Sequence, residues 1–120
     1  MGYEKLVAWQ RADDLFIEVH RLATGAFPPN ERFELSSQLR RAAYSIVANI
    51  VEGMARRSPR EHVHFLNVAQ ASLAEVGYCL HAARRLGYLN DAEWERLIQQ
   101  VKMVGGPLAG LVRSERTRSG

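Results

Sequence analysis

Apolar side chains recur at intervals of three and four residues through most of this chain, in four stretches separated by short connections. This spacing places them on one face of an α-helix, and none of the stretches shows the alternation of a β-strand. The four stripes are Trp9, Ala12, Phe16, Val19 and Ala23; Leu39, Ala42, Ile46, Asn49 and Gly53; Leu66, Ala69, Leu73, Val76, Leu80 and Ala83; and Trp94, Leu97, Val101, Gly105, Leu108 and Leu111. Because short connections make neighbouring helices run antiparallel, the pattern predicts an all-α, antiparallel up-down four-helix bundle.

Glycine and proline separate the first two helices. Gly25 and the pair Pro28 and Pro29 prevent the first helix from continuing. Asn30 can cap the helix that follows them. We expect the second helix to begin at about residue 31 or 33 and to end near Arg56.

The third helix has complete start and stop signals. The Ser58 hydroxyl can accept from a free backbone N–H, and Pro59 falls in the first turn, where no donor is lost. Glu61 completes a capping box with Ser58. Gly87 suits the left-handed position after a helix, so the third helix is expected to lie between residues 58 and 87.

Asn90 and Glu93 repeat the capping pattern at the start of the fourth helix. Pro107 lacks an N–H and its ring crowds the preceding turn, so we expect a kink there. Residues 114–120 contain no apolar side chain. The four-helix bundle domain is therefore expected to span residues 1–113, followed by a disordered basic tail at 114–120.

The length and composition favour one domain in a reducing compartment. A chain of 120 residues can bury a single hydrophobic core. It has neither an apolar run of about 18 residues that could cross a bilayer nor the apolar leader of a secreted protein. The single cysteine, Cys79, cannot form an intrachain disulfide. We expect a cytoplasmic protein in which Cys79 is a small core side chain.

The third helix carries a second stripe of mostly small or apolar residues. It consists of Val68, Ala71, Glu75, Tyr78 and Ala82, with Phe65 and Cys79 beside it. This helix is therefore apolar around more of its circumference than one bundle contact needs. The stripe predicts a second packing surface and hence a homo-oligomer; a wide core within one chain is the alternative.

The residues that could support catalysis or metal binding do not form a recognisable site. His62 and His64 are two positions apart and point about 200° apart on a helix, so they cannot share one metal ion. Glu61 and His64 have the Glu-x-x-His spacing of di-iron bundles, but no second pair accompanies them. The sequence has no nucleophile motif and no glycine-rich phosphate loop. We expect no enzyme activity, metal or cofactor.

Two polar residues, Asn49 and Glu75, occupy positions that resemble core positions. One interpretation makes them part of a buried functional site. The other makes them structural: Asn49 would fix the helix register, and Glu75 would pair with Arg40 or Arg41. The structural interpretation is favoured, since one amide and one carboxylate do not make a reaction.

Arginines dominate the charged residues of the second helix and the turn after it. The candidates for nucleic-acid binding are Arg40, Arg41, Arg56, Arg57 and Arg60, with Glu52 as the acid among them. The start of the third helix adds a positive partial charge and free N–H groups, so this region should attract phosphate. Alternatively, the arginines only solubilise a helix end and complement its dipole. The net charge of +3 is modest.

Three strings carry a resemblance to a known family: LRRAA at 39–43, ANIVEG at 48–53 and SLAE at 72–75. Together with YEKLVAWQRADDL and FPPNERFELSSQLRRA in the first half, they resemble the small four-helix proteins encoded within intervening sequences of bacterial 23S ribosomal RNA genes. The likeness covers about residues 3 to 100. In one departure, Val47 stands where members often have proline in SIPANIAEG, which implies a straighter second helix.

The resemblance implies a bacterial, cytoplasmic protomer that commonly assembles as a pentameric ring. A relative of the family is the accessory variability protein of diversity-generating retroelements. That protein works with a reverse transcriptase and is thought to bind nucleic acid. A homopentamer, an RNA or DNA ligand and a protein partner such as a reverse transcriptase are therefore expectations for this chain.

Two functional hypotheses follow. In the first, the protein is a non-enzymatic, ring-shaped homo-oligomer that binds RNA or DNA phosphates through its arginine-rich surface. In the second, it is a structural adaptor that binds a protein partner and makes no contact with nucleic acid. The sequence has no stacked aromatic and basic motif typical of single-strand recognition.

Overall fold

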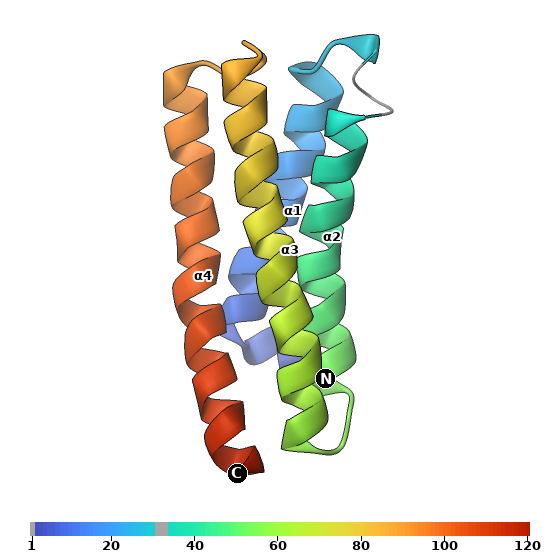
Figure 1. Cartoon of the computed structure of the whole chain (residues 1–120), viewed down its shortest axis with the longest axis vertical. Helices are drawn as coiled ribbons and strands as arrows, with labels where there is room; N and C mark the ends of the chain where they lie inside the picture. Colours follow the sequence, from blue (N-terminus) through green and yellow to red (C-terminus); the bar gives the residue numbers. More distant parts are fainter. Residues whose placement is uncertain (1, 31–33) are drawn as a thin grey trace.

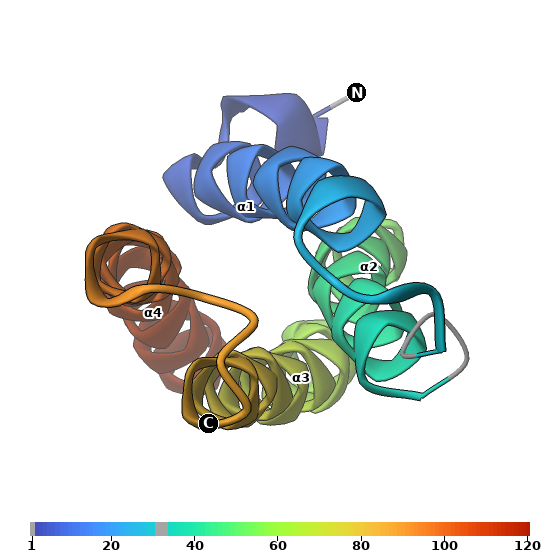
Figure 2. The same cartoon turned by 90° about the horizontal axis from the view of Figure 1, so that it is seen from above.

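The computed structural model describes residues 2–30 and 34–120. Within them, one short 3₁₀ helix, η1 (Gly2–Lys5), precedes four long helices: α1 (Val7–Gly25), α2 (Leu35–Met54), α3 (Pro59–Arg85) and α4 (Asp91–Ser119). The described part of the chain contains no strand, so the prediction of an all-α protein with four packed helices is confirmed. The helices lie side by side along the long axis, with the α2–α3 and α3–α4 connections at opposite ends (Figures 1 and 2).

The helix boundaries follow the capping signals closely. The Glu61 N–H donates to Ser58 Oγ over 3.2 Å at the start of α3. At the start of α4, the Glu93 N–H donates to Asn90 Oδ1 over 2.8 Å and the Asn90 N–H donates to Glu93 Oε1 over 3.1 Å. Gly87 has a φ of +82°, the left-handed conformation predicted for it. Both predicted N-caps and the end of the third helix are therefore confirmed. The capping box is complete at Asn90, whereas at Ser58 the Glu61 carboxylate accepts from the Ser58 hydroxyl at 3.3 Å instead of from the Ser58 backbone N–H.

The second helix differs slightly from its predicted range. It ends at Met54, two residues before Arg56, and the described part of it begins at Leu35. The predicted starts at residues 31 and 33 lie outside the described residues. The Ala55 N–H still bonds to the Val51 carbonyl, and the Arg56 N–H to the Gly53 carbonyl, so the chain leaves the helix in one tight turn.

The expectation of a disordered tail at 114–120 is wrong. The fourth helix passes through Pro107 without ending and runs to Ser119. Glu115 is buried, with 5% of its surface exposed, and lies against α3. Apolar spacing does not predict this part of the helix, because polar contacts rather than apolar ones attach it to the bundle.

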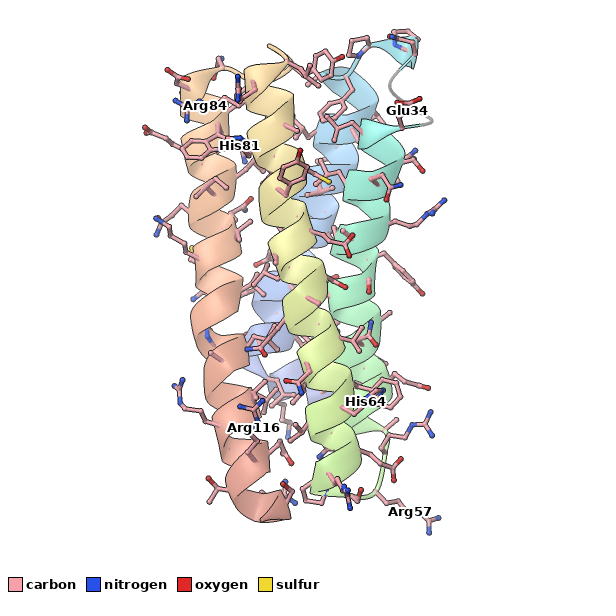
Figure 3. All side chains as sticks on the ribbon, in the orientation of Figure 1. Glu34, Arg57, His64, His81, Arg84 and Arg116 are labelled. Atoms are coloured by element: carbon pink, nitrogen blue, oxygen red, sulfur yellow. The ribbon has the colours of Figure 1, made fainter. Side chains whose placement is uncertain are left out.

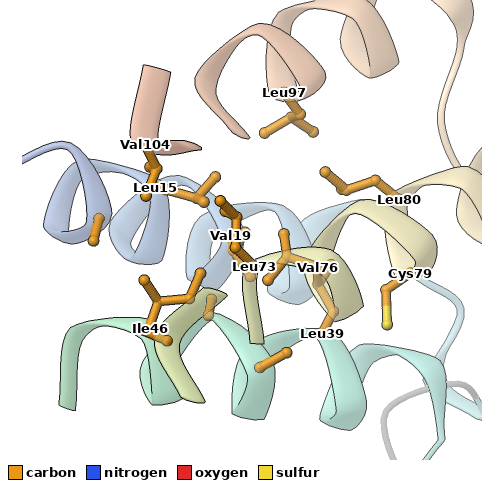
Figure 4. Packing of buried hydrophobic residues seen from close by; sticks show 14 of the residues in the cluster. Leu15, Val19, Leu39, Ile46, Leu73, Val76, Cys79, Leu80, Leu97 and Val104 are labelled. Carbon is orange, nitrogen blue, oxygen red and sulfur yellow. The ribbon is translucent and has the colours of Figure 1, made fainter. Parts of the chain in front are cut away.

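All four helices contribute to one hydrophobic core. Leu15, Ile46, Leu80 and Leu97, one from each helix, are fully buried (Figure 4). Cys79 lies in the same cluster with 7% of its surface exposed, as expected for a small core side chain. Among the described residues, no helix combines the length and apolar character that crossing a membrane requires.

The second stripe of α3 lies outside this core. Tyr78 is 68% exposed and Val68 is 38% exposed, and Ala71 and Glu75 are exposed too. On the neighbouring helix α2, Tyr44 is 60% exposed. The alternative of a wide core within one chain therefore fails for these residues, because the chain itself leaves them uncovered.

Candidate nucleic-acid interface

Three exposed arginines lie where α2 meets α3: Arg56 and Arg57 in the turn, and Arg60 in the first turn of α3. Arg56 is engaged locally: its Nη2 lies 2.8 Å from Glu52 Oε1 and its Nη1 lies 4.0 Å from Glu61 Oε2. The Arg56 guanidinium also lies 5.0 Å from the centre of the Phe65 ring. The positive charge of Arg56 is therefore offset by two carboxylates and held over an aromatic face.

Arg57 and Arg60 differ from Arg56 because they form no ion pair with any residue in the described ranges. Both side chains are exposed. Ser58 caps α3 between them, so both lie beside the first turn of that helix, where the helix dipole adds positive potential. At this end of the bundle, these two arginines are the members of the predicted set that are available to an anion.

Arg40 and Arg41 do not belong to this group. Both lie within α2, and Arg41 is 13 positions before Met54, the last residue of that helix, which is about 20 Å along the axis. The Arg40 Nε donates to the Ser36 carbonyl at 3.4 Å, and Arg40 is half-buried. Arg41 is exposed further along the bundle. The structure thus divides the five predicted arginines into two sets.

Three arginines that the sequence analysis did not single out lie at the same end as the α2–α3 turn. They are Arg113, Arg116 and Arg118, all exposed, in the last turns of α4. Figure 3 shows Arg57 and Arg116 at one end of the bundle and Arg84 at the opposite end. We call residues 113–119 the α4 tail. The basic end is the α4 tail together with residues 52–61, which form the end of α2, the turn and the start of α3.

A buried polar contact joins the two parts of the basic end. His62 in α3 places Nδ1 2.9 Å from Oε2 of Glu115, and Nε2 2.7 Å from the carbonyl oxygen of Arg56. Nη1 of Arg118 donates to both carboxylate oxygens of Glu115, over 2.8 and 3.1 Å. Residues 53 positions apart in the sequence are therefore fixed against each other.

Both ring nitrogens of His62 have partners. A backbone carbonyl can only accept, so Nε2 carries a hydrogen. Nδ1 faces the Glu115 carboxylate at 2.9 Å. This use of both ring nitrogens leaves none for a metal ion.

Metal binding finds no support elsewhere in the described residues. His64 is exposed and lies with its ring 5.1 Å from the Phe65 ring rather than beside His62. Within residues 2–30 and 34–120, no three His, Cys, Asp or Glu side chains gather where they could hold an ion.

Asn49 takes part in a small network between α2 and α3. Its Nδ2 donates to the Ser45 carbonyl at 2.8 Å and to Ser45 Oγ at 3.0 Å. Ser45 Oγ lies 2.7 Å from Ser72 Oγ of α3, so the network crosses the helix interface. Asn49 is half-buried, at the edge of the core rather than inside it.

The predicted pairing of Glu75 with Arg40 or Arg41 is wrong. Glu75 is exposed, and among the described residues it forms no ion pair with either arginine. Position 75 lies on the outer stripe of α3, where its charge remains in solvent. Glu75 borders a shallow hollow that Leu35, Tyr78 and Cys79 also line.

Cys79 is expected to react slowly in the native protein. Burial raises the pKa of the Cys79 thiol, and the Glu75 carboxylate raises it further, so little thiolate forms near neutral pH. Alkylation by iodoacetamide at pH 8, followed by mass spectrometry, should be at least about tenfold slower than in denaturant. Glu75→Gln should speed the native reaction modestly, because it removes a nearby negative charge. Equal alkylation rates in the native and unfolded protein would contradict a buried Cys79 thiol with a raised pKa.

Comparisons with known proteins agree with this fold. The chain resembles a crystal structure described as a protein of unknown function from the S23 ribosomal protein family of Bacteroides thetaiotaomicron. The TM-score is 0.82 at 22% sequence identity, over 88% of this chain and 98% of that chain. No curated protein matches the sequence. The family described as 23S rRNA-intervening sequence protein matches residues 4–110, so the chain belongs to the 23S rRNA-intervening sequence protein family.

Proposed function

We propose that this protein is a non-enzymatic, homo-oligomeric bundle that binds RNA or DNA phosphates through its basic end. The observation that carries the proposal is that Arg57 and Arg60 are exposed beside the start of α3 without an acidic partner in the described residues. Guanidinium groups bind phosphate oxygens through paired N–H donors. Such contacts give affinity without reading base sequence.

The acidic residues of the basic end support this proposal, because local contacts use them. Glu52 and Glu61 face Arg56, and Glu115 faces His62 and Arg118. These carboxylates therefore do not compete for the other arginines. The exposed guanidinium groups of Arg57, Arg60, Arg113 and Arg116 are left to solvent.

The environments of Cys79 and His62, two side chains that could take part in catalysis, also favour binding over catalysis. Cys79 is buried, and its pKa is raised, which makes it a poor nucleophile. His62 is committed to two hydrogen bonds within the fold. Both groups serve packing, so neither is poised to act on a ligand.

The uncovered face of α2 and α3 supports assembly with further copies. Tyr44, Val68 and Tyr78 are exposed apolar side chains on these two helices. In the ring that the family resemblance implies, this face would be covered, and each copy would repeat the basic end. Repetition would multiply the local positive potential beyond that of one chain.

The same face supports a second candidate, a structural adaptor. Exposed aromatic side chains can anchor a protein partner as readily as a second copy. The two candidates differ in what the arginines do. In the adaptor, Arg57 and Arg60 only keep the end of the bundle soluble.

The double variant Arg57→Ala with Arg60→Ala should bind a labelled RNA hairpin on the order of tenfold more weakly than the unaltered chain. The slope of log affinity against log salt should fall by about two, because two phosphate contacts are lost. Fluorescence anisotropy between about 50 and 200 mM salt measures both quantities.

The matched control is the double variant Arg21→Ala with Arg85→Ala. It removes the same charge from exposed positions near the ends of α1 and α3, away from the basic end. The control should change affinity much less. If the unaltered chain does not bind at low salt, or both double variants lose affinity equally, the basic end is not the binding surface and the adaptor gains support.

A further inference from the structure

The α4 tail lies outside the residues that match the family. The family match ends at residue 110, whereas α4 continues to Ser119. The tail contributes two exposed arginines that form no ion pair with described residues, Arg113 and Arg116. They are three residues apart, so they lie on neighbouring positions of one helix face.

The His62–Glu115 contact determines where those arginines lie. Of the tail residues 113–119, Glu115 is the one that is buried; the others are exposed. Polar partners hold it: His62 at 2.9 Å and, from within the tail, Arg118 at 2.8 Å. Without that contact, the last turns would have little to order them, because helix ends fray when no tertiary contact holds them. We call His62 and Glu115 the tail clasp.

We propose that the α4 tail forms the second half of the phosphate-binding surface, that the tail clasp positions it there, and that the ligand is double-helical RNA or DNA. The proposal rests on the proposed function and extends it. The clasp joins α3, which carries Arg60 and begins two residues after Arg57, to α4, where Arg113 and Arg116 lie. Guanidinium groups are therefore held on two helix ends.

Two features favour a duplex over a single strand. Charges fixed on two packed helices, whose axes are typically about 8 to 10 Å apart, suit the regular phosphate array of a rigid double helix. Single strands are usually bound by stacking their bases on exposed aromatic rings. The exposed aromatic side chains of the described residues, Tyr44 and Tyr78, lie along α2 and α3 away from the basic end, and Phe65 is covered by Arg56.

The first test removes the arginines and leaves the clasp intact. Arg113→Ala with Arg116→Ala should weaken binding to a blunt-ended duplex by on the order of tenfold and lower the salt slope by about two. The control double variant Arg21→Ala with Arg85→Ala should change both much less. Parallel titrations of duplex RNA, duplex DNA and one unpaired strand identify the ligand. At least one of the two duplexes should bind more tightly than the unpaired strand.

The second test asks whether Glu115 is a positioning residue. If Glu115 were only an acid near a basic surface, Glu115→Gln would tighten phosphate binding. A positioning role predicts weaker binding, close to that of Arg113→Ala with Arg116→Ala, and no further loss when all three changes are combined. Hydrogen exchange of residues 113–119 should also become faster in Glu115→Gln, and a thermal melt verifies that the bundle remains folded.

The outcomes separate the two proposals. If the unaltered chain does not bind any of the three nucleic acids, the proposed function fails and this inference fails with it. If the chain binds, but the tail arginines matter no more than the control, only the inference fails. Tighter binding by Glu115→Gln would overturn the positioning role of the tail clasp. Tighter binding of the single strand than of both duplexes would overturn the choice of a double-helical ligand. The two-arginine variant keeps the test decisive even if Glu115→Gln unfolds.

Discussion

Replacing His62 with alanine is expected to lower the free energy of unfolding by about 3 kcal/mol, because two buried acceptors lose their hydrogen-bond partner at about 1 to 3 kcal/mol each. The loss has two causes. The buried Glu115 carboxylate loses its nearest partner in α3, and the Arg56 carbonyl loses the donor at 2.7 Å. Arg118 still bonds to Glu115, which keeps the loss from being larger. Chemical denaturation of both proteins measures the difference.

His81→Ala is the matched control, because His81 is an exposed histidine on the same helix. Its effect should stay within about 0.5 kcal/mol. A double-mutant cycle with Glu115→Ala should show that His62→Ala costs much less once the carboxylate is gone. If His62→Ala costs no more than His81→Ala, the contact does not stabilise the α4 tail.

The helices were predictable because their signals are local. Ser58, Asn90 and Gly87 each act on backbone groups within a few residues, so their effects can be read without knowing the fold. The apolar stripes similarly place Leu80 and Leu97 in the core from spacing alone. Four helices with short connections then leave few possible arrangements.

The composition of the basic end was only partly predictable, because it depends on which distant segments meet. Proximity in the sequence grouped Arg40 with Arg57, yet the length of α2 separates them. The partnership of His62 with Glu115 spans 53 positions and leaves no periodic trace. Glu115 has polar neighbours in the sequence, and its partners His62 and Arg118 are polar too, so no apolar pattern marks it as buried. These are tertiary effects that local patterns do not encode.

Glu75 was predicted to be buried, but it is exposed. Its place on a helical stripe suggested a buried carboxylate that needed a cation. The structure shows that α3 has two apolar faces, of which one packs in the bundle and the other, with Tyr78, faces solvent. Periodicity identifies a face but not what covers it. For α3, only the arrangement of the helices distinguishes the core stripe from the outer one.

The close approach of α2 and α3 makes Gly53 a position where even a methyl group should be costly. A Cβ added there would lie 2.8 Å from the Phe65 Cβ and 3.6 Å from the His62 carbonyl oxygen. The Phe65 Cβ is fixed to the backbone, so the helices themselves must separate beside the α2–α3 turn. The absence of a side chain at Gly53 therefore allows α2 and α3 to pack this closely.

Gly53→Ala should consequently destabilise the fold by about 2 kcal/mol, since overpacking outweighs the gain of about 1 kcal/mol that alanine brings to a helix. Gly77→Ala provides the matched control: it is also within a helix, but nothing lies within 4 Å of its added Cβ. That change should stabilise the protein by about 0.5 to 1 kcal/mol, the helix propensity alone. If thermal denaturation shows that Gly53→Ala is destabilised and Gly77→Ala is stabilised, the difference comes from the tight contact at Gly53, because helix propensity favours alanine equally at both positions. If both variants were stabilised, α2 and α3 would not be packed as closely as the structure places them.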